Sequence, residues 1–211
     1  GGTLSLNTRG GNSVSATATD AAGNVSTAGS QTLTINSTAP AIPVLTSPAL
    51  TNDTTPVISG TAEAGSIVTV SVGGATYTAL AAGGTWSIDL DTATPSSGTL
   101  SLNANGTNSV SVTATDGAGN VSTAGTQTLT IDTTAPTAPA ITSTALTNDS
   151  TPSISGTALA GSTMTITVGG ATYTTVATGG TWSIDLGTAT PVSGTLSLNA
   201  NGTNAVSVTA T

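Results

Sequence analysis

The sequence has no cysteine, histidine, lysine or phenylalanine, and Arg9 is its only basic residue. Without cysteine, neither disulfide bonds nor thiolate-bound zinc is available to the chain. Without histidine, cysteine and lysine, the commonest general bases, thiol nucleophiles and Schiff-base amines are missing, so we expect no enzyme. A chain with one cation and nine acidic residues cannot neutralise a run of phosphates, so we also expect no nucleic-acid partner.

Long apolar runs and helix-forming charged residues are equally scarce. No apolar run reaches the roughly 18 residues that a membrane-spanning helix needs, so we expect no membrane insertion. Charged residues make up 5% of the chain and hydrophobic residues 36%, a balance that argues against intrinsic disorder. Glycine and β-branched residues are frequent, and this composition favours strands over helices.

A repeat of 96 residues organises the chain. Trp86 returns as Trp182, and the segment TLSLN begins at Thr3, Thr99 and Thr195. The period divides the chain into the C-terminal part of one module (1–39), a complete module (40–135) and a module that lacks its last strand (136–211). Because both ends fall inside a module, we expect the chain to be a segment of a longer array.

Within one module, apolar and polar residues alternate in short segments separated by glycine-rich turns. Such segments predict an all-β, immunoglobulin-like sandwich of about seven strands. Trp86 and Trp182 have the inward phase of their strands and are expected in the core, whereas Tyr77 and Tyr173 follow Gly-Gly turns and are expected to be partly exposed. The predicted strands of the complete module lie near 43–47, 55–61, 67–72, 75–81, 85–90, 108–115 and 126–132, with 99–103 as a further edge.

Two proline-containing linkers join the modules, INSTAPAIP at 35–43 and IDTTAPTAP at 131–139. Each proline fixes its own φ and restricts the residue before it, so these joints are expected to be stiffer than Gly/Ser linkers. The modules are therefore expected to form an extended rod.

Four sequence motifs at fixed spacing carry a resemblance to a known family. They are the linker DTTAP at 132–136, the turn TNDTTP at 51–56, GTAEAGS at 60–66 and ATDGAGNVS at 114–122. Together they resemble the bacterial immunoglobulin-like repeats that extend giant biofilm-associated and RTX-type surface adhesins. The resemblance implies a sandwich fold, secretion to the bacterial cell surface, a mainly mechanical role, and calcium at or near the joints between modules.

The strand order gives a separate reason to consider a metal. If the first strand runs down from one pole, the loops that hold Glu63 and Asp116 and the linker that holds Asn36 all lie at that pole. Their carboxylate and amide oxygens suit calcium better than zinc or copper. The alternative is that these acids bond only their own loop backbones, as Asx-turns do. Further candidate ligands are Asp132 and Asp20, which match Asn36 and Asp116 in neighbouring repeats, and Asp53 and Asp149 at the opposite pole.

The expected function is that of a structural extender in a large surface adhesin. Neighbouring repeats of the same chain would be its partners, and a distal domain would bind the host or surface ligand. Two alternatives stay open. The module itself could bind a glycan, a surface or ice, or incomplete end modules could exchange strands and assemble a fibre.

Overall fold

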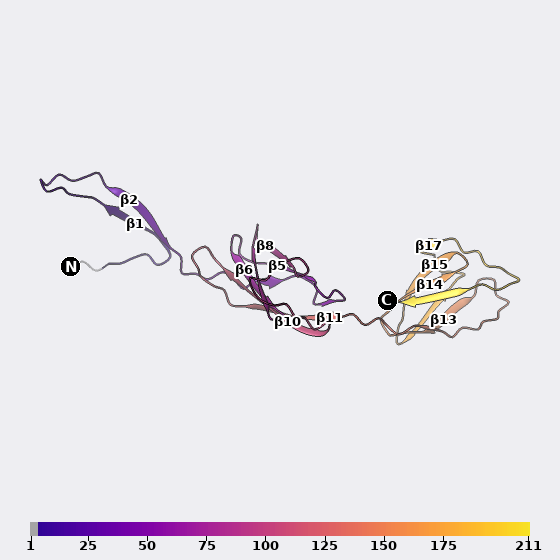
Figure 1. Cartoon of the computed structure of the whole chain (residues 1–211). Coiled ribbons are helices and arrows are strands. Elements are labelled where there is room, and N and C mark those ends of the chain that lie inside the picture. Colours follow the sequence, from indigo (N-terminus) through magenta and orange to yellow (C-terminus); the bar gives the residue numbers. More distant parts are fainter. Residues whose placement is uncertain (1–3) are drawn as a thin grey trace. The chain divides into compact units, whose positions relative to one another are not determined.

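The computed structural model describes residues 4–211. These residues divide into two compact units, with the boundary between Thr133 and Thr134. All regular elements among the described residues are strands, and this confirms the all-β fold class (Figure 1). The predicted division into three parts by the phase of the repeat stays a prediction.

The first unit begins with a two-stranded antiparallel hairpin, β1 (Gly10–Ala16) and β2 (Gly29–Ile35). By the 96-residue period, β1 and β2 correspond to the last two strands of the complete module. Val14 and Leu33 are exposed in this hairpin, whereas their counterparts Val110 and Leu129 are fully buried. The difference arises because the hairpin lacks a second sheet among the described residues, while the complete module has one.

Two sheets form the complete module that follows. One sheet has the order β3-β5-β8 and the other the order β4-β11-β10-β6-β7-β9. Antiparallel pairing predominates, and only β4 runs parallel to its neighbour β11 among these pairs of described strands. The strands are β3 (Val44–Leu45), β4 (Leu50–Thr51), β5 (Val57–Thr61), β6 (Ile67–Val72), β7 (Ala75–Leu80), β8 (Thr85–Asp89), β9 (Ser97–Gly98), β10 (Asn105–Thr115) and β11 (Gly125–Asp132).

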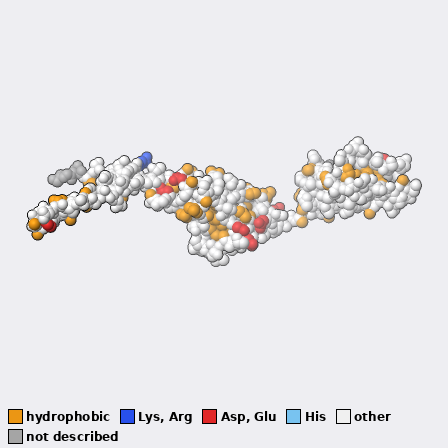
Figure 2. Space-filling model, turned by 90° about the horizontal axis from the view of Figure 1, so that it is seen from above, with side chains coloured by type: hydrophobic (Ala, Val, Ile, Leu, Met, Phe, Trp, Pro, Cys, Tyr) orange, Lys and Arg blue, Asp and Glu red, His pale blue; other side chains and the backbone are white. Residues whose placement is uncertain are grey.

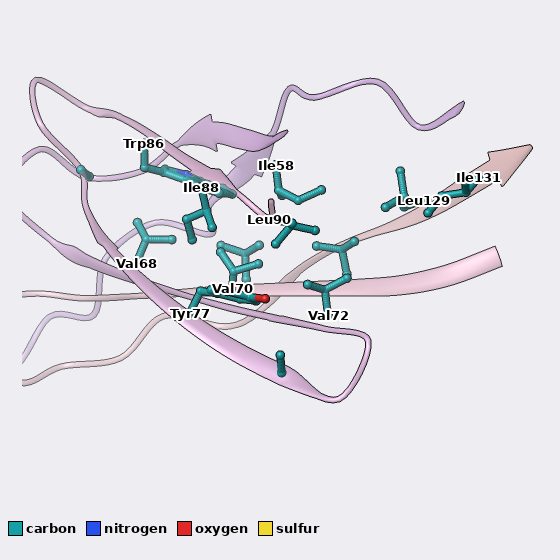
Figure 3. Packing of buried hydrophobic residues seen from close by; sticks show 14 residues of the cluster. Ile58, Val68, Val70, Val72, Tyr77, Trp86, Ile88, Leu90, Leu129 and Ile131 are labelled. Atoms are coloured by element: carbon teal, nitrogen blue, oxygen red, sulfur yellow. The ribbon is translucent and has the colours of Figure 1, made fainter. Parts of the chain in front are cut away.

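The core lies between these two sheets and is built from small aliphatic side chains around one tryptophan and one tyrosine. Trp86 and Ile88 from β8 face Val70 of β6 and Tyr77 of β7 across the sandwich (Figure 3). Alternate residues of each strand are buried, as the period of two requires. The sandwich fold and the inward position of Trp86 are therefore confirmed.

Three details differ from the predictions. The edge expected at 99–103 is not a strand; β9 ends at Gly98, and Leu100 and Leu102 pack against the core from a loop instead. The first strand is split, since β3 pairs with β5 while β4 crosses to the other sheet and pairs with β11. Tyr77 is buried, because on β7 it stands opposite Val70 and faces the core.

The second unit repeats this architecture with fewer strands. Its sheets have the orders β12-β13-β16 and β17-β15-β14-β18. Tyr173 is 1% exposed, which again corrects the expectation of a partly exposed tyrosine, and Trp182 is buried as predicted. The strands are β12 (Ala140–Ile141), β13 (Ser153–Thr157), β14 (Thr163–Val168), β15 (Ala171–Val176), β16 (Thr181–Asp185), β17 (Ser193–Gly194) and β18 (Val206–Ala210).

Uncharged side chains dominate the face seen in Figure 2, and most of the acidic side chains on it lie over the complete module. Residues 4–211 include no helix long and apolar enough to cross a membrane.

Candidate functional site at the first joint

The loop after β10 holds Asp116 in a tight turn. Thr115 and Val121 form an isolated bridge, and Gly119, at φ 90°, allows the chain to reverse between them. The Asp116 Oδ1 atom accepts hydrogen bonds from the backbone N–H groups of Ala118 (2.9 Å) and Asn120 (2.8 Å). The Asn120 Nδ2 atom donates to Oδ2 at 2.8 Å. The Asx-turn alternative therefore describes the hydrogen bonding of this loop.

These bonds stabilise the ionised carboxylate. The pKa of Asp116 lies below the usual aspartate value, chiefly because the Asn120 side chain donates to it, although desolvation acts in the opposite direction. Asp116 is only partly buried, so solvent moderates the effect. The carboxylate is thus a charged acceptor at neutral pH.

Asn36, from the linker that enters the module, lies directly against this loop. Its Nδ2 atom donates to Asp116 Oδ2 at 2.7 Å, and its backbone carbonyl accepts from Asn120 Nδ2 at 3.0 Å. Its side-chain Oδ1 atom accepts from the backbone N–H of Thr38 at 3.0 Å. The structure therefore brings together Asn36 and Asp116, which are 80 residues apart in sequence.

Two prolines complete this joint. Pro40 and Pro43 are both buried, and Pro43 is among the most completely buried residues of the chain. Gly125, at the start of β11, lies so close to the Pro43 carbonyl that a Cβ atom there would collide with it. The linker is therefore packed onto the module as well as hydrogen-bonded to it.

Glu63 lies in the loop between β5 and β6. Thr115 pairs with Ile67 at the start of β6, so the Glu63 and Asp116 loops lie at the same end of the module. Glu63 is exposed, and its backbone carbonyl accepts from the Ser66 N–H and hydroxyl groups. Within residues 4–211, no three acidic, histidine or cysteine side chains are grouped closely enough to hold a metal ion.

The other candidate ligands lie in separate places. Asp20 forms the same loop as Asp116 in the hairpin, with its pKa lowered chiefly by the Asn24 side chain. Asp53 and Asp149 each accept the backbone N–H two residues later at 2.9 Å, as Asx-turns do. Asp132 ends β11 opposite Asn105.

Calcium at this joint, which the family resemblance implies, can be tested against the donor set. The Asp116 carboxylate already accepts four hydrogen bonds, and Asn36 presents its amide N–H, not its carbonyl oxygen, to that carboxylate. Calcium requires oxygen ligands with free lone pairs, commonly six to eight of them. The residues in this arrangement do not fit a calcium ion at Asp116, and calcium binding stays a prediction.

Sequence reasoning missed a second group of polar residues. Asn108 is 8% exposed; its Oδ1 accepts from Asn103 N–H and its Nδ2 donates to the Asn103 carbonyl, which closes the turn before β10. The same bonds recur between Asn12 and Asn7, and between Asn204 and Asn199. The sequence does contain a signal for this turn, because two asparagines five residues apart recur in every repeat.

One family model matches most of the complete module. Residues 44–133 match the model of a family described as "Bacterial Ig-like domain". A comparison with curated proteins gave no match.

Solved structures of repeated domains resemble the chain weakly. One is described as "Crystal structure of chicken CNTN1 FN1-FN3 domains", with 11% identity over 94% of this chain and 71% of that one and a TM-score of 0.41. Another is the "Central Fibronectin-III array of RIM-binding protein", with 16% identity over 82% of this chain and 57% of that one and a TM-score of 0.26. The family match covers residues 44–133, and the two-sheet sandwich of the complete module is consistent with a bacterial Ig-like module.

Proposed function

We propose that this chain is a structural extender, a run of sandwich modules that spaces other parts of a bacterial surface protein. The observation that carries the proposal is the joint itself. Asn36 and the Asp116 loop bond each other in both directions, and the adjoining prolines are buried. A linker that served only as a tether would need neither feature.

The surface and core support a passive role. Both tryptophans and both tyrosines are buried, so none of the four offers a stacking platform for a sugar. The 96-residue repetition copies loops and turns along the chain, whereas a catalytic site is usually unique. We therefore propose a non-catalytic module that leaves ligand binding to other domains.

The finer assignment follows the resemblance of the sequence motifs. We propose that the parent protein is a secreted adhesin of the biofilm-associated or RTX type, exposed at the bacterial cell surface. In this proposal, neighbouring repeats are the direct partners of each module, and a distal domain contacts the host or surface ligand.

Length scaling tests the extender function. Chains that carry one, two or four further copies of the 96-residue repeat should show a maximum dimension, measured by small-angle X-ray scattering, that rises in proportion to the number of modules. A dimension that levels off as modules are added would contradict an extender.

The same scattering series tests the calcium prediction when it is recorded in calcium and in excess chelator. Calcium-stiffened joints predict a longer maximum dimension in calcium. Superimposable curves would remove calcium from the proposal and would leave the extender function intact.

A second candidate function is assembly by strand exchange. Val206 and Val208 on β18 are partly exposed, whereas their counterparts Val110 and Val112 are covered in the complete module. Strand β2 has the sequence GSQTLTI and differs at one position from GTQTLTI, which begins β11 and pairs with β10. Strand β18 is an edge strand, so the β2 strand of a second copy would fit beside it once it had left β1, with which it pairs in this structure.

Light scattering after size exclusion separates the two candidates. Strand exchange predicts dimers and longer oligomers whose share rises with concentration. A monomer at every concentration would exclude this candidate.

A further inference from the structure

The residue at position 36 is an asparagine, but the 96-residue period places an aspartate, Asp132, at the corresponding position of the next linker. These two side chains have nearly the same shape but differ in hydrogen-bonding capacity. The amide can donate hydrogen bonds, whereas an ionised carboxylate only accepts them. The exchange therefore changes what a linker can bond to.

At the first joint, the donor is the part of Asn36 that matters. The Thr38 N–H group bonds to Oδ1, and this contact turns Nδ2 toward Asp116. The Asn120 side chain then links the Asp116 carboxylate to the Asn36 carbonyl, so that the linker and the loop are held by a closed set of bonds. We call this set, formed by Asn36, Asp116 and Asn120, the joint clasp.

We propose that the joint clasp closes the first joint without a cation, and that an aspartate at position 36 would make this joint depend on one. The inference rests on the proposed function in so far as the joints limit bending. The inference attributes the limit on bending at this joint to Asn36, whereas the family resemblance attributes it to calcium.

The physical reason is charge balance. Asn36 satisfies the charged Asp116 oxygen with an N–H donor, and a hydrogen bond to an ionised acceptor is stronger than one between neutral groups. An aspartate at position 36 would place a second negative charge within hydrogen-bonding distance of the first, and the two would repel at neutral pH. Only a proton or a bound cation would then hold them together.

Distance measurements between spin labels test this directly, because the chain has no cysteine of its own. Thr32→Cys on β2 and Ser87→Cys on β8 place one label on each side of the joint at exposed positions. The distance distribution is recorded by pulsed electron spin resonance in excess chelator and again in calcium. Circular dichroism and tryptophan fluorescence check that every variant keeps the sandwich fold.

Four chains are compared. The chain with Asn36 should give a single narrow distribution in chelator, and Asn36→Ala should lose it. Asn36→Asp should lose it in chelator and regain it in calcium. Asn24→Ala is the matched control: it removes the same type of amide–carboxylate bond within the hairpin loop, away from the joint, and should keep the narrow distribution.

Each other result has a distinct meaning. A narrow distribution for Asn36→Ala, or for Asn36→Asp in chelator, overturns the clasp, and so does a broad distribution for Asn24→Ala. If the chain with Asn36 gives a broad distance distribution in chelator and a narrow one only in calcium, the clasp is also overturned, although the extender function survives. If the chain with Asn36 gives a broad distribution in both chelator and calcium, the joint is not stiff, and the proposed function loses its basis. If the Asn36→Asp variant keeps a broad distribution in calcium, the proposed dependence of an aspartate joint on a cation is refuted.

Discussion

At the scale of single residues, Gly60 shows how closely the tryptophan is packed. A Cβ atom on Gly60 would collide with the Val44 carbonyl oxygen and lie 2.7 Å from a ring carbon of Trp86. Gly156 has the same surroundings, with Trp182 in place of Trp86. The inward tryptophan therefore requires a glycine on the neighbouring strand.

We predict that Gly60→Ala destabilises the module by about 1–3 kcal/mol, the usual cost of overpacking a core. Gly117→Ala is the control, because Gly117 has negative φ and a methyl group added there would meet no atom within 4 Å. Chemical denaturation followed by tryptophan fluorescence measures both. Equal stability of the two variants would contradict the packing described for Trp86.

The two Asx-turn carboxylates make a pH prediction. The pKa values of Asp20 and Asp116 lie below the usual 3.8, so their hydrogen bonds stabilise the loops fully above that value and are lost as pH falls through the lower folded-state pKa. Carboxyl ¹³C chemical shifts followed by NMR should show both groups titrating below pH 3.8. Titration at or above that pH would contradict the hydrogen bonding of these loops.

At the scale of elements, alternation located most strands well, because burial on one face repeats every second residue. Strands β6 and β8 lie within one residue of their predicted bounds. The split of the first strand into β3 and β4 was missed, since which sheet a short segment joins depends on its partners and not on its own pattern. The segment at 99–103 misled for the same reason: Leu100 and Leu102 reach the core without strand pairing.

The asparagine-closed turn before β10 is an element that can be tested alone. We predict that Asn108→Ala destabilises the module by about 1 kcal/mol, because the part-buried hydrogen bonds of the buried Asn108 side chain to the Asn103 N–H and carbonyl groups are lost. Asn12→Ala should cost less, because the equivalent bonds in the hairpin are exposed to water. Hydrogen exchange of the Asn103 and Asn7 amides measures both, and a larger loss at Asn12 would contradict the role of burial.

The candidate site was predictable in part. Strand order alone brought the Asn36 linker and the Asp116 loop to one pole. It could not show that Asn36 would present its N–H group or that Asn120 would bond to both sides, because such orientations depend on loop geometry. Nor could it separate calcium from an Asx-turn, since both use the same aspartate.

At the scale of the whole molecule, the repeats differ in residues near the joints. The sandwich core is copied closely from repeat to repeat, so the modules themselves are similar. Polar positions in the linker and in the β5–β6 loop are copied less closely, since Asn36 of the linker corresponds to Asp132 and Glu63 of the loop corresponds to Leu159. Joints of one array are therefore expected to differ in stiffness and in their response to cations.

The central claim is that the first joint holds the β1–β2 hairpin and the complete module together as one rigid body. The most direct test is ¹⁵N relaxation of the intact chain in excess chelator. Amides of the β1–β2 hairpin and of the complete module are predicted to report the same rotational correlation time. A clearly shorter correlation time for the hairpin would show that the joint is a free hinge and would contradict the claim.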